Sequence, residues 1–414
     1  MSVARVLAAG TLCLAVCAGA AAQDKGVLPF NAREIEDILR HGPWPPQISR
    51  DSSNRVSGSQ RAAAFGAQLF FDARLSLNGN ISCASCHIPE SGWSDGRARA
   101  VGREETDRNT KSTLNARFNR WFGWGGASDS LWAASLRPLL DPREMGNTER
   151  HVATLVRTQR DLACGYRSAF GRAPAADDET LFVDIGKALA AFQETHVTAR
   201  TPFDDFRDAL ARGDRNAATR YPLAAQRGLR LFVGAARCNV CHVGPQCTNG
   251  EFDKVGIAVR DARGGFDWGR YDGIKALQAG RFNLLSRHND ERSHANAISM
   301  RHVVLDPEAY GAFKVPALRN VALTPPYMHN GMLATLRDVV RHYSEIDEAK
   351  LAIAASLSHV EPGDFLIQPA RGSVLQTLNL SEAQISDIVA FLETLTERRP
   401  LVRRPAPSVV ACGS

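Results

Sequence analysis

Two cysteine motifs are the clearest indication of chemistry in this sequence. In each, two cysteines separated by two residues are followed at once by a histidine: Cys83, Cys86 and His87, then Cys238, Cys241 and His242. This spacing is typical of haem c, in which both thiols form thioethers with the haem and the histidine binds the iron. Zinc, the rival ligand, would need four donors per site, and neither motif has a second CxxC or an HxxxH nearby. The sequence therefore predicts two covalently bound haem c groups.

The opposite face of each iron decides between a carrier and an enzyme. An electron carrier fills both axial positions, whereas an enzyme leaves one open for peroxide or oxygen. Residues 88–150 contain no histidine, and their one methionine, Met145, stands beside Glu144, a better candidate for acid-base work. We therefore expect an open first haem. For the second haem, the candidate ligands are Tyr343, Met300, Met328 and Met332. Tyr343 also fits an ordinary core position, so the residues alone leave this ligand open.

The elements that must hold these motifs are mostly helical. Residues 60–87 and 226–242 share Gln-Arg, a small-residue helix with Gly and Leu-Phe, and then CxxCH, which suggests two related domains. Helical spacing also marks residues 180–194, a helix capped by Thr335, and a helix that begins with a capping box of Ser381 and Gln384. Period-2 strands are scarce. The predicted fold class is mainly α, with two cytochrome c-like haem domains and long loops.

The ends of the chain point to export. Arg5, an apolar run over residues 6–20 and three alanines before Gln23 resemble a cleaved signal peptide (residues 1–22), although a membrane anchor is the alternative. We then expect a surface leader rich in Pro and Ser (23–57), the first, peroxide-binding haem domain (58–205), the second haem domain (206–400) and a basic, Pro-rich tail (401–414). The mature protein is predicted to be periplasmic, and an oxidising compartment permits Cys164 and Cys247 to pair.

Composition narrows the class of partner. The chain of 414 residues is 44% hydrophobic and 23% charged, with a formal net charge of +6. Apart from the tail, Lys and Arg are scattered, and long basic tracts are absent, which argues against nucleic-acid binding. No stretch after the leader is long and apolar enough to span a membrane. The partners we expect are hydrogen peroxide and a protein, either a substrate or a small redox protein.

The ordered motifs resemble one family. LFFDARLS, DRNTKSTLNARF, LRPLLDPREMG and FKVPALRNVALTPPYMHNGMLATLRDVVRHY, together with both CxxCH motifs, are similar to the bacterial di-haem cytochrome c peroxidase and MauG superfamily over residues 58–396. The resemblance implies that Glu144 is the distal acid-base residue, with Pro138 in the same pocket and Trp124 between the haems. It implies a calcium ion held by Asn109, Thr324 and Pro326. It also assigns Tyr343 as the second haem's axial ligand, as in the MauG branch, where the peroxidase branch has Met.

Some positions depart from the family pattern. Ala134 stands where a distal Gln is common, Gly125 replaces an Asp after the Trp, and Ala236 occupies the place of the surface Trp through which MauG passes charge. HGPWPP, SSNRVSGS and RWFGWGGASDSLWAASLRPLLDPREMG look most like the MbnH branch, which oxidises a Trp on a copper-binding partner. The substrate and contact surface of MauG should therefore not be assumed for this chain.

Three functions follow as hypotheses. The leading one is an enzyme that uses hydrogen peroxide to form a high-valent di-haem state and oxidises a partner protein. The second is a di-haem cytochrome c peroxidase that takes electrons from a small cytochrome, which Tyr343 disfavours because an anionic ligand stabilises oxidised iron. The third is a non-catalytic electron carrier, which requires two six-coordinate haems.

Overall fold

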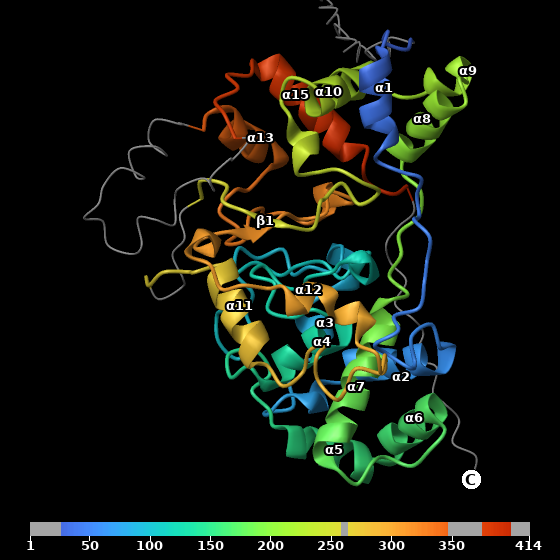
Figure 1. Ribbon diagram of the computed structural model, residues 1–414, viewed down its shortest axis with the longest axis vertical. Helices are drawn as coiled ribbons and strands as arrows, with labels where there is room; N and C mark the ends of the chain where they lie inside the picture. The colour runs from blue at the N-terminus through green and yellow to red at the C-terminus, as the bar shows by residue number, and fades with distance from the viewer. Residues whose placement is uncertain (1–25, 258–263, 347–374, 399–414) are drawn as a thin grey trace, which may run out of the picture.

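The computed structural model describes residues 26–257, 264–346 and 375–398. Two helical lobes lie end to end, with loops and a short two-stranded sheet between them (Figure 1). The sheet pairs β1 (Phe252–Asp253) with β2 (Phe313–Lys314) in antiparallel register, Phe252 opposite Lys314. The predicted fold class, mainly α with long loops, is confirmed. The expected signal peptide, the basic tail, Cys13, Cys17 and Cys412 lie outside the described residues.

The first lobe is built around one central helix. Its helices are α2 (Gln60–Phe70), α3 (Cys83–Cys86), α4 (Leu131–Leu140), α5 (Glu149–Thr158), α6 (Arg160–Phe170) and α7 (Asp178–Gln193). The α7 helix is buried on nearly all sides because α2, α4 and α5 pack around it. A helix with apolar residues all round is stable only in such a core. The expected helix over residues 180–194 is confirmed, and the side chain of Asp177 caps its start.

The second lobe is also helical and has its own hydrophobic core. It contains α8 (Pro202–Ala211), α9 (Arg215–Ala218), α10 (Leu223–Val233), α13 (Leu336–Ser344) and α15 (Glu382–Glu393). The predicted caps form, because Thr335 with Asp338 and Ser381 with Gln384 each make a complete capping box. Phe203 and Phe206 of α8 belong to this core. We therefore propose that the two haem domains meet within residues 197–201, slightly before the expected boundary.

The internal repeat corresponds to one repeated helix crossing. In the first lobe α2 crosses α7, and a Cβ added at Gly66 would lie 2.0 Å from the carbonyl oxygen of Ala188. In the second lobe α10 crosses α15, and a Cβ at Gly228 would lie 1.9 Å from the carbonyl oxygen of Asp387. Both glycines stand three residues before the shared Leu-Phe pair. Glycine therefore allows the two helix backbones to touch at the same point of each lobe.

The N-terminal segment corrects the expectation of a surface leader. Its helix α1 (Ala32–Leu39) packs on α8 and α10, and Ile38 is fully buried in the core of the second lobe. The chain then runs the length of the molecule to α2 (Figure 1). On the way Trp44 is buried and donates its indole N–H to the carbonyl of Thr198 at 3.0 Å. Pro and Ser content suggested exposure, but the apolar side chains between them find partners in both lobes.

A segment that follows the second haem motif folds back onto the first lobe. It carries α11 (Arg270–Ala279) and α12 (Ile298–Arg301), and Leu277 and Met300 share a buried cluster with Trp121. Phe282 packs against Phe182 of α7. The predicted second haem domain, residues 206–400, includes this segment, yet its side chains pack against the first lobe. No helix in the described part of the chain is long and apolar enough to cross a membrane.

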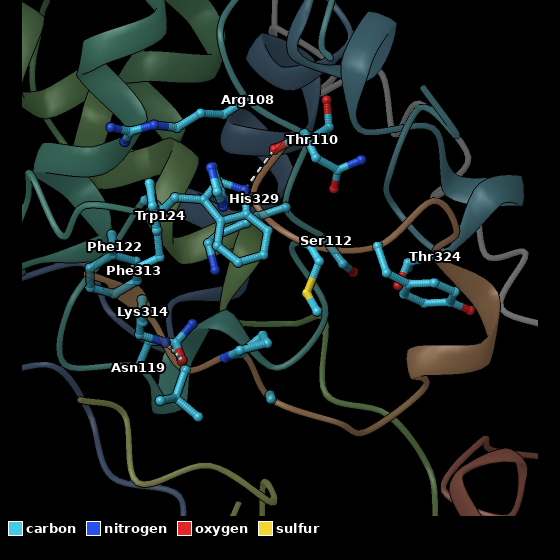
Figure 2. Close-up of a pocket in the computed structure, with 18 of the residues that line it drawn as sticks. Arg108, Thr110, Ser112, Asn119, Phe122, Trp124, Phe313, Lys314, Thr324 and His329 are labelled. Atoms are coloured by element: carbon cyan, nitrogen blue, oxygen red, sulfur yellow. Dashed lines mark hydrogen bonds between the residues drawn. The ribbon is translucent and has the colours of Figure 1, made fainter. Parts of the chain in front are cut away.

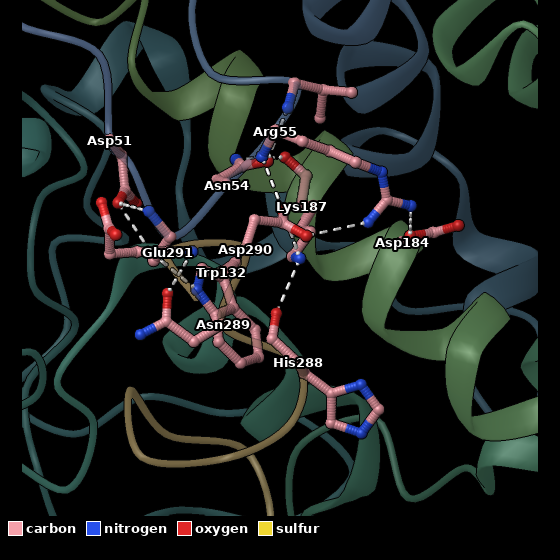
Figure 3. Close-up of polar contacts among 12 residues, drawn as sticks. Asp51, Asn54, Arg55, Trp132, Asp184, Lys187, His288, Asn289, Asp290 and Glu291 are labelled. Atoms are coloured by element: carbon pink, nitrogen blue, oxygen red, sulfur yellow. Dashed lines mark hydrogen bonds and ion pairs between the residues drawn. The ribbon is translucent and has the colours of Figure 1, made fainter. Parts of the chain in front are cut away.

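A polar cluster fastens this returning segment in place (Figure 3). Lys187, fully buried on α7, donates to the carboxylate of Asp290 at 2.6 Å and to the carbonyl of His288 at 2.8 Å. Arg55 from the N-terminal segment pairs with both Asp290 and Asp184. Three stretches that are distant in sequence thus meet at one group of charges.

Candidate haem site

One cavity of about 790 Å³ contains both haem motifs. All the residues predicted for the site line it: Cys83, Cys86, His87, Asn109, Trp124, Pro138, Glu144, Cys238, Cys241, His242, Thr324, Pro326 and Tyr343. Figure 2 shows side chains from the segments around Trp124 and Phe313 facing this space together with His329. The structure therefore brings together residues spread over more than 250 positions of the chain.

A hydrogen bond to a backbone carbonyl orients each of the two motif histidines. His87 Nδ1 lies 3.2 Å from the carbonyl oxygen of Trp93, and His242 Nδ1 lies 3.0 Å from that of Cys247. A carbonyl oxygen only accepts, so in each ring Nδ1 carries the proton and Nε2 keeps its lone pair for a metal. Trp93 and Cys247 both have positive φ, 60° and 52°, which turns their carbonyls toward the rings. This orientation is what a proximal haem ligand requires.

Buried cations give a second sign that an anionic group belongs here. Burial lowers the pKa of Lys111 well below its usual value, with further contributions from Lys314 and Arg108. Burial also lowers the pKa of Lys314 to about 8, and its Nζ donates to the side chain of Asn119 at 3.1 Å. Both ammonium groups line the cavity. The propionates of a haem would restore their charge, so the residues present fit the cofactor that the two motifs predict.

Glu144 has the environment of an acid-base group. It lines the cavity near Cys83 and Cys86, whose thiols its carboxylate influences. Burial, and to a smaller extent nearby Asp141, raise the pKa of Glu144 to about 7, while Arg137 and Arg143 oppose the shift. A carboxyl with a pKa near neutrality can both take and give a proton at physiological pH. Pro138 lies inside α4, and its carbonyl accepts from the backbone N–H of Met145, next to Glu144.

Trp124 is held by the residue predicted to bind calcium. Its indole N–H donates to the carbonyl of Asn109 at 2.9 Å, and the Nζ of Lys111 lies 3.6 Å from the centre of its ring system. The backbone N–H of Asn109 donates to the carbonyl of His329 at 2.7 Å. The side-chain amide of Asn109 donates to the carbonyl of Arg97, which leaves its side-chain oxygen as the atom for a cation. Asn109 thus connects both segments that meet at this wall of the cavity.

Tyr343 lies beside the second motif. It lines the cavity, and Cys241, Cys238 and Asp253 all contribute to raising the pKa of its phenol, after burial. Met328 also lines the cavity, whereas Met300 is buried against Trp121 and Leu277, and Met332 is 53% exposed. Of the four candidate ligands for the second haem, only Tyr343 and Met328 line the cavity.

Two cavity residues were missed because no local pattern marks them. His329 is buried, its ring stacks on Phe313 at 3.6 Å between ring centres, and its Nε2 has no hydrogen-bond partner. It lies in the last motif of the family resemblance, far in the sequence from residues 88–150, which follow the first CxxCH motif. Gln193 comes from the end of α7 and donates its amide to Ser135, next to Ala134. An amide is therefore present beside the position where the family's distal Gln is replaced.

Two departures from the family pattern now have a physical account. A Cβ at Gly125 would lie 2.6 Å from the carbonyl oxygen of Gly269, so the returning segment leaves no room for an Asp. Ala236 is 8% exposed and packs in the second core, so this position offers no aromatic contact to a partner. The described residues hold no group of three or more His, Cys, Asp or Glu side chains arranged for a metal ion.

Cys164 and Cys247, which an oxidising compartment would permit to pair, are not joined to each other. Cys247 is a fully buried free thiol, whereas Cys164 is disulfide-bonded. The carbonyl of Cys247 orients His242, so this residue serves the haem site through its backbone.

The helical lobes, the two oriented CxxCH motifs and the shared cavity define a di-haem c-type protein. The family model of di-haem cytochrome c peroxidase, which includes MauG, matches residues 60–213. The methylamine utilization protein MauG of Methylorubrum extorquens is 30% identical over 97% of this chain and 96% of its own length. The cytochrome-c peroxidase IdrP1 of Denitromonas iodatirespirans is also 30% identical, over 97% of this chain and 94% of its own.

A solved structure agrees with these relatives. A MauG-like protein associated with microbial copper homeostasis superposes with a TM-score of 0.62 at 26% identity, over 89% of this chain and 97% of its own. The chain belongs to the di-haem cytochrome c peroxidase/MauG family. It is a haem-dependent oxidoreductase of the peroxidase class, and the family implies two haems.

Proposed function

We propose that this enzyme uses hydrogen peroxide to oxidise a side chain of a partner protein, with peroxide bound at the haem carried by His87. The observation that carries the proposal is the single cavity, in which both haem motifs, Glu144 and Trp124 face one another. Oxidising equivalents formed at one motif then reach the other without crossing a protein core.

The chain's own residues have defined tasks in this proposal. When bound, the two haems supply the iron that activates peroxide and holds two oxidising equivalents. Glu144 accepts a proton from the near oxygen of peroxide and returns it to the leaving oxygen, which departs as water and so favours heterolytic cleavage. His87 and His242 would hold the irons through Nε2, and Tyr343 would be the second residue that binds the iron at the Cys238–His242 motif. Pro138 shapes the distal pocket, and Trp124 connects the two sites electronically.

A copper-binding protein is the proposed class of partner, with a Trp as the oxidised residue. The support is the likeness to a MauG-like protein associated with copper homeostasis. A cytochrome c peroxidase remains the second candidate, because the identity to cytochrome-c peroxidase IdrP1 equals that to MauG. We also propose that residues 1–22 direct export and that the enzyme works in the periplasm.

One experiment separates these candidates. Low-temperature EPR of the oxidised holoprotein should show one high-spin and one low-spin ferric haem, and both signals should fade after one equivalent of peroxide. The peroxide-treated protein is then mixed with reduced small cytochrome c or with a candidate copper-binding protein. Oxygen mass or a crosslink on that protein supports the proposal. Fast cytochrome oxidation without such a product would favour the peroxidase, and two low-spin signals indifferent to peroxide would contradict both.

We further propose that calcium binds the side-chain oxygen of Asn109 and the backbone carbonyls of Thr324 and Pro326. Hard oxygen donors suit Ca²⁺, and the site would join the Trp124 loop to the second lobe. Chelation with EGTA should lower the unfolding temperature and slow the loss of the ferric signals with peroxide. Calcium should restore both, and magnesium should not. The variant Asn109→Ala should already behave like the chelated protein, and insensitivity to EGTA would contradict the site.

A further inference from the structure

An aromatic chain leads from the cavity wall toward the surface through the returning segment. Trp124, Trp268, Phe266 and Tyr310 all pack against Phe313. The rings of Trp268 and Tyr310 are 5.2 Å apart between centres, and those of Tyr310 and Tyr271 are 4.2 Å apart. Phe313 itself stacks on the cavity histidine His329. Trp124 and Trp268 are thus linked through a single phenyl side chain.

The tyrosines at the outer end of this row of aromatic side chains are accessible to solvent. Tyr271 and Tyr310 are half-buried, and their hydroxyl groups are hydrogen-bonded to each other. Tyr271 lies in the first turn of α11. A phenol that loses an electron also releases its proton, and at a half-buried position water can take it. Tyrosine and tryptophan are the side chains that give up an electron most readily.

Backbone hydrogen bonds and close glycine contacts fix the positions of these aromatic residues. The backbone N–H of Lys314 donates to the carbonyl of Trp124 at 2.8 Å, and Gly269 pairs with Tyr310 in an isolated antiparallel bridge. Close contact of Gly125 with Gly269 and Gly273 holds the Trp124 loop against α11. The same packing that excludes an Asp at position 125 therefore seats the aromatic residues.

We propose that Trp268, Tyr310 and Tyr271 form the exit through which the enzyme draws electrons from its partner protein, in place of the surface Trp that Ala236 replaces. This inference rests on the proposed function, since hydrogen peroxide is the oxidant. One peroxide takes up two electrons and two protons and leaves as two waters. Each electron comes from an oxidisable side chain of the partner, passes through Tyr271 or Tyr310 and Trp268, and reaches Trp124. The tyrosine proton is lost to water and regained when the partner reduces the radical.

The test uses the holoprotein without a partner. After one equivalent of hydrogen peroxide, samples frozen at successive times are examined by EPR for the ferric haems and for an organic radical. Ring-deuterated tyrosine identifies a tyrosyl radical by its narrowed line, and peptide mapping locates oxygen added to the protein's own residues. The variants are Trp268→Phe and the double variant Tyr271→Phe/Tyr310→Phe. The matched control is Tyr166→Phe, since Tyr166 bonds to Asp184 in the first core, away from this chain.

The outcomes separate this inference from the proposed function. We expect fading ferric signals, a tyrosyl radical and oxygen addition at Tyr271 or Tyr310, with the radical lost in the double variant, weakened in Trp268→Phe and retained in Tyr166→Phe. Fading ferric signals with an unchanged radical in the double variant would overturn the exit and leave the proposed function standing. Ferric signals that ignore peroxide would overturn both.

Discussion

The burial of one carboxyl group sets the expected pH behaviour of the first haem site. Glu144 has a pKa raised to about 7, chiefly by burial. If its carboxylate accepts the proton of peroxide, the rate constant for loss of the ferric signals should rise with pH and level off above about 7. Glu144→Gln should lower that rate constant by about 10²- to 10⁴-fold and remove the pH dependence. Stopped-flow absorbance between pH 5 and 9 measures both.

The control for this prediction is Glu90→Gln, which changes an exposed carboxyl in the same lobe. It should react with peroxide like the native protein at every pH. A Glu144→Gln protein that keeps the native rate or the native pH profile would show that another group moves the proton.

The second axial ligand is a choice between two cavity residues, Tyr343 and Met328. Tyr343→Phe should convert the low-spin ferric signal to high-spin, because the phenyl ring cannot bind iron. Tyr343→Met should raise the reduction potential of the second haem, since a thioether favours ferrous iron and a phenolate favours ferric iron. EPR and a spectroelectrochemical titration measure these changes. An unchanged spectrum in Tyr343→Phe, with a changed one in Met328→Leu, would assign the methionine instead.

At the element scale, the two glycine crossings should be indispensable for packing. Gly66→Ala and Gly228→Ala each place a methyl group about 2 Å from a backbone carbonyl of the partner helix. Overpacking of this kind typically costs about 1–3 kcal/mol, and backbone atoms have little freedom to move away. Both variants should unfold at lower temperature, as followed by circular dichroism. Gly26→Ala, whose methyl group meets nothing, is the control and should unfold like the native protein.

The elements predictable from sequence were those defined by local physics. The Ser381 and Thr335 caps and the apolar stripe of α7 lie within one helix each, and all three formed as expected. The burial of Trp44 and the return of residues 264–303 to the first lobe depend on partners more than a hundred positions away. Spacing in the chain carries no record of such contacts. The same reason explains why the CxxCH pattern predicts cysteines for haem attachment, whereas no pattern in the sequence marks His329 and Gln193.

At the scale of the whole molecule, the cluster around Lys187 should hold the returning segment on the first lobe. Lys187→Met removes the buried partner of Asp290, which then keeps Arg55 as its ion-pair partner among the described residues (Figure 3). Breaking a buried pair costs about 3–5 kcal/mol, and the partial exposure of Asp290 favours the lower end. Urea unfolding should show this loss, and limited proteolysis should cut within residues 281–297 sooner than in the native protein.

The control for this prediction replaces an exposed lysine instead of the buried one. Lys275→Met removes a surface pair with Asp272, in which both side chains are about half exposed, and such pairs contribute about 0–1 kcal/mol. Lys187→Met/Asp290→Asn should recover part of the stability, because no carboxylate is then left buried without its lysine. Since α11 and Trp268 lie on the same returning segment, Lys187→Met should also weaken the peroxide-generated tyrosyl radical. Equal unfolding midpoints for the two lysine variants would mean that apolar packing, not this charge cluster, holds the segment that carries the aromatic exit.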